Sequence, residues 1–148
     1  MPAEHPHVDP QTRAEIEALV VEHAWLIDHH QSEKLADLYT EDGRLLGVGP
    51  DRIGREAILA YGRDRAKMTK RTARHVITNL RLVKDGPKRI RGTNIVTLFR
   101  SDGDTIGHPG PIGVADCFET YVQGDDGRWR IAERKVVIVF ESEAHKAG

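Results

Sequence analysis

One histidine of this chain, His75, has a setting that suggests chemistry. Residues 74–82 alternate as a β-strand does, which places successive side chains on opposite faces. The face that carries His75 mixes apolar and polar residues, as the wall of a small-molecule pocket does. The simpler interpretation is a hydrogen-bonded histidine at the rim of a sheet. The alternation assigns Ile77, Asn79 and Arg81 to the face of His75, and Val76, Thr78, Leu80 and Leu82 to the other face.

A second unusual position is Asp28, at the end of the first predicted helix. That helix begins with Asp9 as its N-cap and Pro10 as its first residue, and it runs to about residue 29 or 30. The helix dipole disfavours an anion at this end by about 0.3–1 kcal/mol. We therefore expect Asp28 to have a partner that is cationic or donates a hydrogen bond. A distant residue, the adjacent His29 or His30, or solvent could fill that role.

The same helix is apolar on two adjoining faces, so more than one element should cover it. The second face could border a pocket, and it ends in the carboxylate of Asp28. The first stripe consists of Ile16, Leu19, Val20, His23, Ala24 and Ile27, and the second of Val21, Ala24, Trp25 and Asp28.

The remaining elements predict an α+β fold. Helices come first and long antiparallel strands follow, which favours helices packed on one face of a strongly curved, mostly antiparallel sheet. The glycine-rich loop 101–111 could cover a pocket. We expect short helices at 33–39 and 54–67, and strands at 44–48, 72–83, 89–100, 112–123 and 128–141, with a hairpin turn at 125–127.

Composition limits the classes of function. The chain has 148 residues, a formal net charge of −1 and a pI near 6.7, and its Lys and Arg residues form no basic run. Nothing therefore points to nucleic acid or an anionic membrane as a partner. Cys117 is the only cysteine, which excludes an internal disulfide and a cysteine metal cluster. We expect a single cytoplasmic domain over residues 1–148, with its core at about 10–140, loose ends and no membrane span.

Four short motifs, in order, carry a resemblance to a known family. They are Leu-Ile-Asp at 26–28, Leu-Tyr-Thr-Glu-Asp-Gly at 38–43, Gly-Arg-Glu-Ala-Ile at 54–58 and Gly-Arg-Trp-Arg-Ile at 127–131. Their order and spacing resemble the SnoaL-like branch of the cone-shaped α+β barrel superfamily. That superfamily also holds nuclear transport factor two and the ketosteroid isomerases.

The resemblance implies a catalytic pair. Some enzymes of the superfamily pair an Asp near the end of the first helix with a His on the strand that follows the third helix. They are scytalone dehydratase, bile acid 7α-dehydratase and hexachlorocyclohexane dehydrochlorinase. The matching positions here are Asp28 and His75, and the dehydrochlorinase also shares a Thr-Asn-Leu-Arg-Leu run after the histidine. The implied activity is a lyase of the dehydratase or dehydrohalogenase type, or an isomerase. It would act on a small apolar compound, cyclic or carbonyl-bearing, with no metal or organic cofactor.

Further positions are candidates for substrate binding. The family places an ionisable or hydroxyl residue five positions before the Asp, here His23, and an arginine on the last strand, here Arg134. His23 differs from the tyrosine or lysine of the relatives and could equally be a core histidine, and Arg134 could be a solvated strand residue. Trp25, Asn79, Cys117 and Glu119 complete the candidate set.

Several alternatives stay open. A ketosteroid isomerase is disfavoured because Leu45, Leu46 and Gly47 stand where its base carboxylate would be. A non-catalytic domain of the same fold, binding a ligand or a structural partner, is the main alternative, and the Asp28–His75 distance discriminates. A metal site at His29 and His30 is disfavoured because adjacent helical side chains diverge. Members usually pair through the outer sheet face, so a homodimer or larger homo-oligomer is expected, with Val76, Leu80 and Leu82 supplying apolar area.

Overall fold

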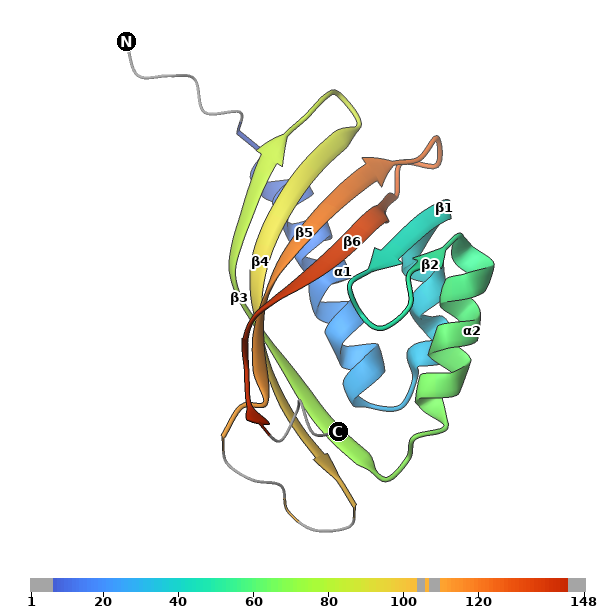
Figure 1. Ribbon diagram of the computed structural model, residues 1–148. Helices are drawn as coiled ribbons and strands as arrows, with labels where there is room; N and C mark the ends of the chain where they lie inside the picture. Colours follow the sequence, from blue (N-terminus) through green and yellow to red (C-terminus); the bar gives the residue numbers. More distant parts are fainter. Residues whose placement is uncertain (1–6, 104–105, 107–109, 144–148) are drawn as a thin grey trace.

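Three N-terminal helices pack on a six-stranded sheet (Figure 1). The computed structural model describes residues 7–103, 106 and 110–143. Residues 104–105 and 107–109 of the loop predicted as a lid, and most of the two ends predicted to be loose, lie outside this part. The helices are α1 (Pro10–Asp28), the 3₁₀ helix η1 (Ser32–Leu38) and α2 (Arg55–Ala66). The strands are β1 (Tyr39–Leu46), β2 (Arg52–Ile53), β3 (Arg71–Lys84), β4 (Arg89–Asp102), β5 (Gly113–Gln123) and β6 (Trp129–Glu141).

The sheet is mixed and open. Its strand order is β2-β1-β6-β5-β4-β3, and every neighbouring pair is antiparallel except β1 with β6, which is parallel. The predicted α+β class is confirmed, but the sheet is not strongly curled, so the predicted strong curvature is wrong. The reason lies at the β2 edge, where a strand of only Arg52 and Ile53 cannot continue the ladder towards β3.

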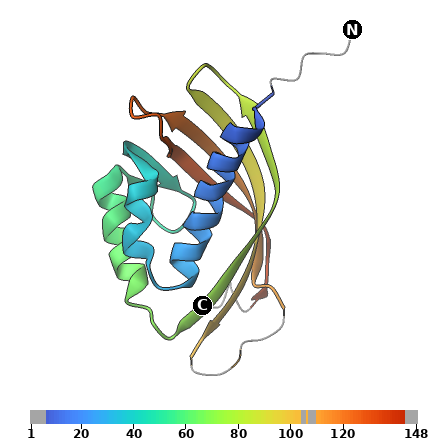
Figure 2. The same cartoon turned by 180° about the vertical axis from the view of Figure 1, so that it is seen from behind.

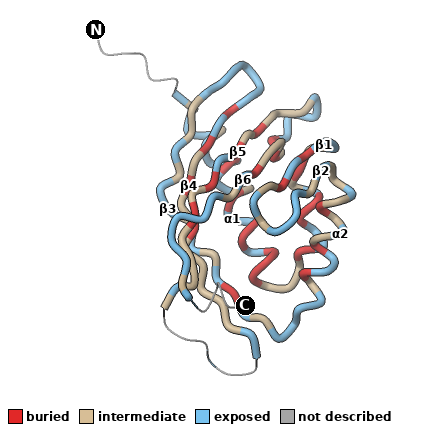
Figure 3. The backbone as a smooth tube through the Cα atoms, in the orientation of Figure 1, coloured by how far each residue is buried: buried red, intermediate tan, exposed pale blue. Residues whose placement is uncertain are grey.

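The helices of the described chain lie on one side of the sheet. α1 runs along this face, and η1 and α2 lie beside it, as the two opposite views show (Figures 1 and 2). Buried backbone is concentrated where α1, η1 and α2 meet the sheet (Figure 3). The core includes Ile16, Val20, Leu35, Tyr121 and Ile131, each at most 1% exposed. None of these helices is long and apolar enough to cross a membrane.

α1 begins and ends as its sequence predicts. The side chain of Asp9 accepts a hydrogen bond from the backbone N–H of Thr12 at 2.9 Å, and Pro10 occupies the first turn. The second apolar face is only partly covered, because Val21 is 56% and Trp25 51% exposed. Ala24 and Asp28, which lie closer to the first stripe, are buried.

A β-bulge in β3 overturns part of the predicted alternation. Asn79 has a φ of +59°, and the register with β4 shifts between Thr78 and Arg81. The extra residue reverses the facing of everything after it. Asn79 is therefore exposed rather than on the inner face with His75. Leu80 and Leu82, predicted to face outward, pack instead against the core.

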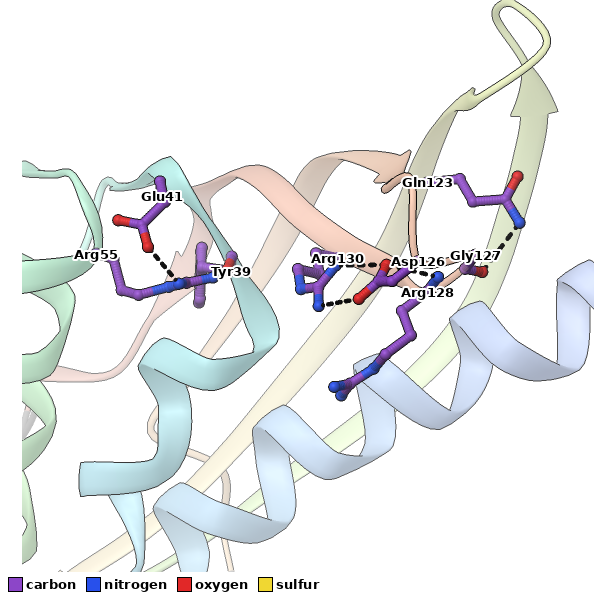
Figure 4. Close-up of polar contacts among 8 residues, drawn as sticks. All are labelled: Tyr39, Glu41, Arg55, Gln123, Asp126, Gly127, Arg128 and Arg130. Atoms are coloured by element: carbon purple, nitrogen blue, oxygen red, sulfur yellow. Dashed lines mark hydrogen bonds and ion pairs between the residues drawn. The ribbon is translucent and has the colours of Figure 1, made fainter.

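Two polar clusters hold the end of the molecule near the β5–β6 hairpin (Figure 4). Arg55 of α2 donates hydrogen bonds to Glu41 at 2.7 Å and to the backbone carbonyl of Tyr39. In the hairpin turn, Asp126 accepts from Arg130 at 2.7 Å and from the backbone N–H of Arg128 at 3.0 Å. These donors hold the pKa of Asp126 below its usual range.

Candidate functional site

A cavity of about 580 Å³ opens between the helices and the sheet. Its walls come from α1, α2, all six strands and some of the loops beside them, so only the assembled fold creates it. Apolar side chains form most of the lining, with a few polar groups among them, as in small-molecule sites. The apolar part includes Ile27, Leu45, Val96, Leu98, Val136 and Ile138. His23, His75, Cys117 and Arg134 line the same space.

Asp28 and His75 meet at the edge of this cavity. One carboxylate oxygen of Asp28, Oδ1, lies 2.5 Å from Nδ1 of His75, and Oδ2 accepts the backbone N–H of His75 at 2.9 Å. The Asp28 residue is only 8% exposed. Two donors thus offset the cost of an anion at the end of α1. Because a carboxylate only accepts, the proton between them belongs to Nδ1, and in a neutral imidazole this leaves a lone pair on Nε2.

His23 forms a neutral pair with a tyrosine. Its Nε2 lies 2.9 Å from the hydroxyl of Tyr39, and the two rings meet edge to face. Burial, aided by the charges of Arg134 and His75, holds the pKa of His23 well below its ordinary value. Burial also raises the pKa of Tyr39. Both groups are therefore uncharged near neutral pH, and His23 can hydrogen-bond a neutral or developing negative group.

Arg134 is fixed from behind by a carboxylate. Its Nη1 donates to Oε1 of Glu119 at 2.8 Å, and Nδ2 of Asn94 donates to the same oxygen at 2.5 Å. Burial alone would favour the neutral guanidine, but Glu119 outweighs it and the pKa of Arg134 is raised. Cys117 is fully buried beside this pair, and burial raises the pKa of its thiol. The thiol is therefore protonated at neutral pH and is a poor nucleophile.

Three of the candidates for substrate binding do not line the cavity. Trp25 stacks on His29 at the surface, with ring centroids 3.7 Å apart. Asn79 is turned outward by the bulge. Glu119 lies behind Arg134 and acts on the cavity only through it.

The structure adds residues that the sequence reading missed. Arg65 and Tyr61 reach the cavity from α2, and Arg71 reaches it from the start of β3. A signal for Arg65 was present: Ile58, Gly62 and Arg65 follow helical spacing and form the buried stripe of α2. An arginine in such a stripe is unusual and needs an explanation.

The described residues contain no cluster that could hold a metal ion. No group of three or more His, Cys, Asp or Glu side chains converges within this part of the chain. Nδ1 of His29 is hydrogen-bonded to the carbonyl of Trp25 at 2.9 Å. The geometry at the end of α1 is therefore that of an Asp–His pair.

Known structures share this fold at low sequence identity. A protein from Novosphingobium aromaticivorans, provisionally named a scytalone dehydratase, is 19% identical with a TM-score of 0.75, over 88% of this chain and 86% of that one. LinA is 21% identical with a TM-score of 0.71, and the match covers 88% of this chain and 87% of LinA. A protein from Catenulispora acidiphila, solved in complex with S-DNPA, is 24% identical with a TM-score of 0.70. The match covers 88% of this chain and 95% of that protein.

Comparison at the level of sequence identifies the family. No curated protein matches the chain. The family described as SnoaL-like domain matches residues 10–135, which include both Asp28 and His75. The resemblance predicted from four short motifs is confirmed, and this chain belongs to the SnoaL-like domain family.

Proposed function

We propose that the protein is a cofactor-independent lyase of the dehydratase or dehydrohalogenase type. The observation that carries the proposal is the Asp28–His75 pair, with an O–N distance of 2.5 Å, on the wall of a mostly apolar cavity. A purely structural pair would not need a free imidazole nitrogen beside such a space. An isomerase would use the same base and is the nearest variant of the proposal.

In the proposed reaction, Nε2 of His75 removes a proton from a carbon of the substrate. The electrons of that C–H bond form the new double bond, and the leaving group departs from the neighbouring carbon with its bonding pair. Asp28 holds the imidazole in the reactive tautomer and stabilises the imidazolium that forms. A base placed in this way contributes about 10²–10⁴-fold to the rate.

Departure of the leaving group would be assisted by other polar groups at the cavity. The neutral His23–Tyr39 pair can donate to a departing hydroxyl or halide, and Arg134 supplies positive charge nearby. For a dehydration, the proton taken by His75 can return to hydroxide, so that water leaves and the enzyme is regenerated. The volume and the apolar lining suit a small ring compound.

A direct test compares three variants against a panel of hydroxylated and halogenated ring compounds. We expect His75→Ala and Asp28→Asn to lower kcat by about 10²–10⁴-fold while ligand binding survives. The matched control is His29→Ala, which removes an imidazole next to Asp28 but outside the cavity lining. Turnover that persists in His75→Ala would refute the base assignment.

The second candidate function is ligand binding without catalysis. It is favoured by the size of the cavity and by a structural neighbour of the same fold that holds the small molecule S-DNPA. This candidate predicts that wild-type protein binds panel members and leaves them unchanged, and that His75→Ala affects only affinity.

We also propose that the chain self-associates through the sheet face opposite the helices. Val76 is 44%, Phe118 47% and Val137 38% exposed there. Burying such apolar area against a second copy would stabilise a dimer. Leu80 and Leu82, predicted for this surface, belong to the core instead.

A further inference from the structure

One arginine on the cavity wall has no ion-pair partner within 4 Å among the residues that the structure describes. Arg65 is only 7% exposed, and its Nη1 is buried without a hydrogen-bond partner among the residues that the structure describes. It enters the cavity from the last turns of α2. Burial and the charge of Arg71 lower the pKa of Arg65, and Tyr61, Asp28 and Asp102 offset this only in part. The charged form of Arg65 is therefore incompletely compensated.

Each of the other four arginines of the lining has a hydrogen-bond, ion-pair or ring partner. Arg134 is paired with Glu119 at 2.8 Å, and Arg71 with Asp102 at 2.7 Å. Arg100 also approaches Asp102, at 3.7 Å. Arg52 donates to the carbonyl of Val48 and lies over the ring of Tyr61, 4.5 Å from its centroid.

The balance of charge around the cavity is positive. Among the described residues, five arginines line it and Asp64 is the single lining carboxylate, while Glu119 and Asp102 outside the lining offset Arg134 and Arg71. Asp64 is itself shared with Lys67, 3.7 Å away at the surface. Walls of low polarity concentrate this positive potential inside the cavity. A neutral apolar ligand would leave both the potential and the donors of Arg65 unused.

We propose that the natural ligand carries a carboxylate, and that Arg65 binds it. A guanidinium matches a carboxylate with two parallel hydrogen bonds, and a buried site strengthens both. Arg65 and His75 reach the cavity from different elements, α2 and β3. The ligand is thus a small ring acid, held by its carboxylate at Arg65 while the remainder extends towards His75. This inference deepens the proposed function by naming a substrate class, and it rests on that proposal only for the role of His75.

Calorimetry with two probes of one shape tests the assignment. 2-Naphthoate is an anion, and 2-naphthamide is its neutral analogue. We expect wild-type protein to bind the carboxylate at least about tenfold more tightly, which corresponds to about 1.4 kcal/mol. Arg65→Met should abolish the preference. Arg63→Met, which removes an exposed arginine of the same helix outside the cavity lining, should keep it.

Three results would overturn the assignment. They are no binding of naphthoate, no preference over the amide, and a preference that survives in Arg65→Met. Melting temperature gives a separate check, because removing an unpaired buried charge should not destabilise the fold. A clear fall in the melting temperature of Arg65→Met, but not of Arg63→Met, would assign Arg65 a structural role and would also refute the proposal.

The two proposals can fail independently. His75→Ala should keep the preference for naphthoate, since the base does not bind the carboxylate. Loss of elimination activity in His75→Ala therefore reports on the lyase proposal alone, and loss of anion preference in Arg65→Met reports on the carboxylate site alone.

Discussion

At the scale of single residues, the buried imidazole of His23 makes the fold sensitive to acid. The unfolded chain binds a proton on this group near pH 6.5, whereas the folded protein does so only at much lower pH. Below pH 6.5 the unfolded state therefore binds more protons than the native state does. By linkage, stability falls as the pH falls through this range, and His23 has no effect on it well above pH 6.5.

His23→Gln should therefore make the stability of the fold less sensitive to acid. Urea denaturation between pH 4.5 and 8 should show a shallower loss of unfolding free energy on acidification than in wild-type protein. The control is His29→Gln, because His29 stacks on Trp25 at the surface and is not buried. Equal slopes in wild-type protein and His23→Gln would show that other groups dominate the acid response.

At the scale of elements, a glycine sets the distance between α2 and η1. A Cβ on Gly62 would lie 2.1 Å from the backbone carbonyl oxygen of Ser32, and the hydroxyl of Ser32 donates to the carbonyl of Gly62 at 2.7 Å. The close approach places the C-terminal half of α2, and with it Arg65, against the cavity.

Gly62→Ala should therefore push the two helices apart. We expect a loss of about 1–3 kcal/mol, the usual cost of overpacking. Arg63→Ala at the adjacent exposed position is the control and should change stability by less than about 0.5 kcal/mol. Chemical denaturation measures both, and similar stability of the two variants would contradict the close contact.

The bulge in β3 supports a second prediction at this scale. Asn79 adopts a φ of +59°, which Asn and Gly tolerate and β-branched residues do not. Asn79→Val should cost about 1–2 kcal/mol, and Asn79→Gly should be close to neutral. Thr78→Val, on an exposed position of the same strand, is the control. A tolerated Asn79→Val, with Leu80 still packed against the core, would argue against the bulge.

At the scale of the whole molecule, the proposed dimer depends on the sheet face opposite the helices. Phe118→Glu should shift the protein towards monomer, with a dimer dissociation constant raised at least about tenfold, because it places a charge in the proposed interface. Val21→Glu makes the same change at a 56% exposed apolar residue on the helical side, and should leave assembly unaltered. Analytical ultracentrifugation of the three proteins distinguishes the cases, and a monomeric wild type would exclude the proposed dimer.

Much of the architecture could be predicted from local patterns. The N-cap of α1, the order of helices and strands, and the hairpin turn at 125–127 depend on short-range backbone preferences. Asp28 and His75 stand out in the sequence because each is unusual for the element that carries it. The bulge at Asn79 could not be predicted in this way, since a single extra residue is determined by pairing with β4 rather than by alternation within β3.

By itself, the sequence determined the α+β class, the family and the two residues most suited to chemistry, because periodicity and capping are recorded in neighbouring residues. Only the tertiary structure decided which side chains share the cavity. It placed His23, Arg65 and Arg134 on its walls and left Trp25 and Asn79 in solvent. The physical reason is that a cavity is made where elements distant in sequence pack together, and no local pattern records which of their faces will meet.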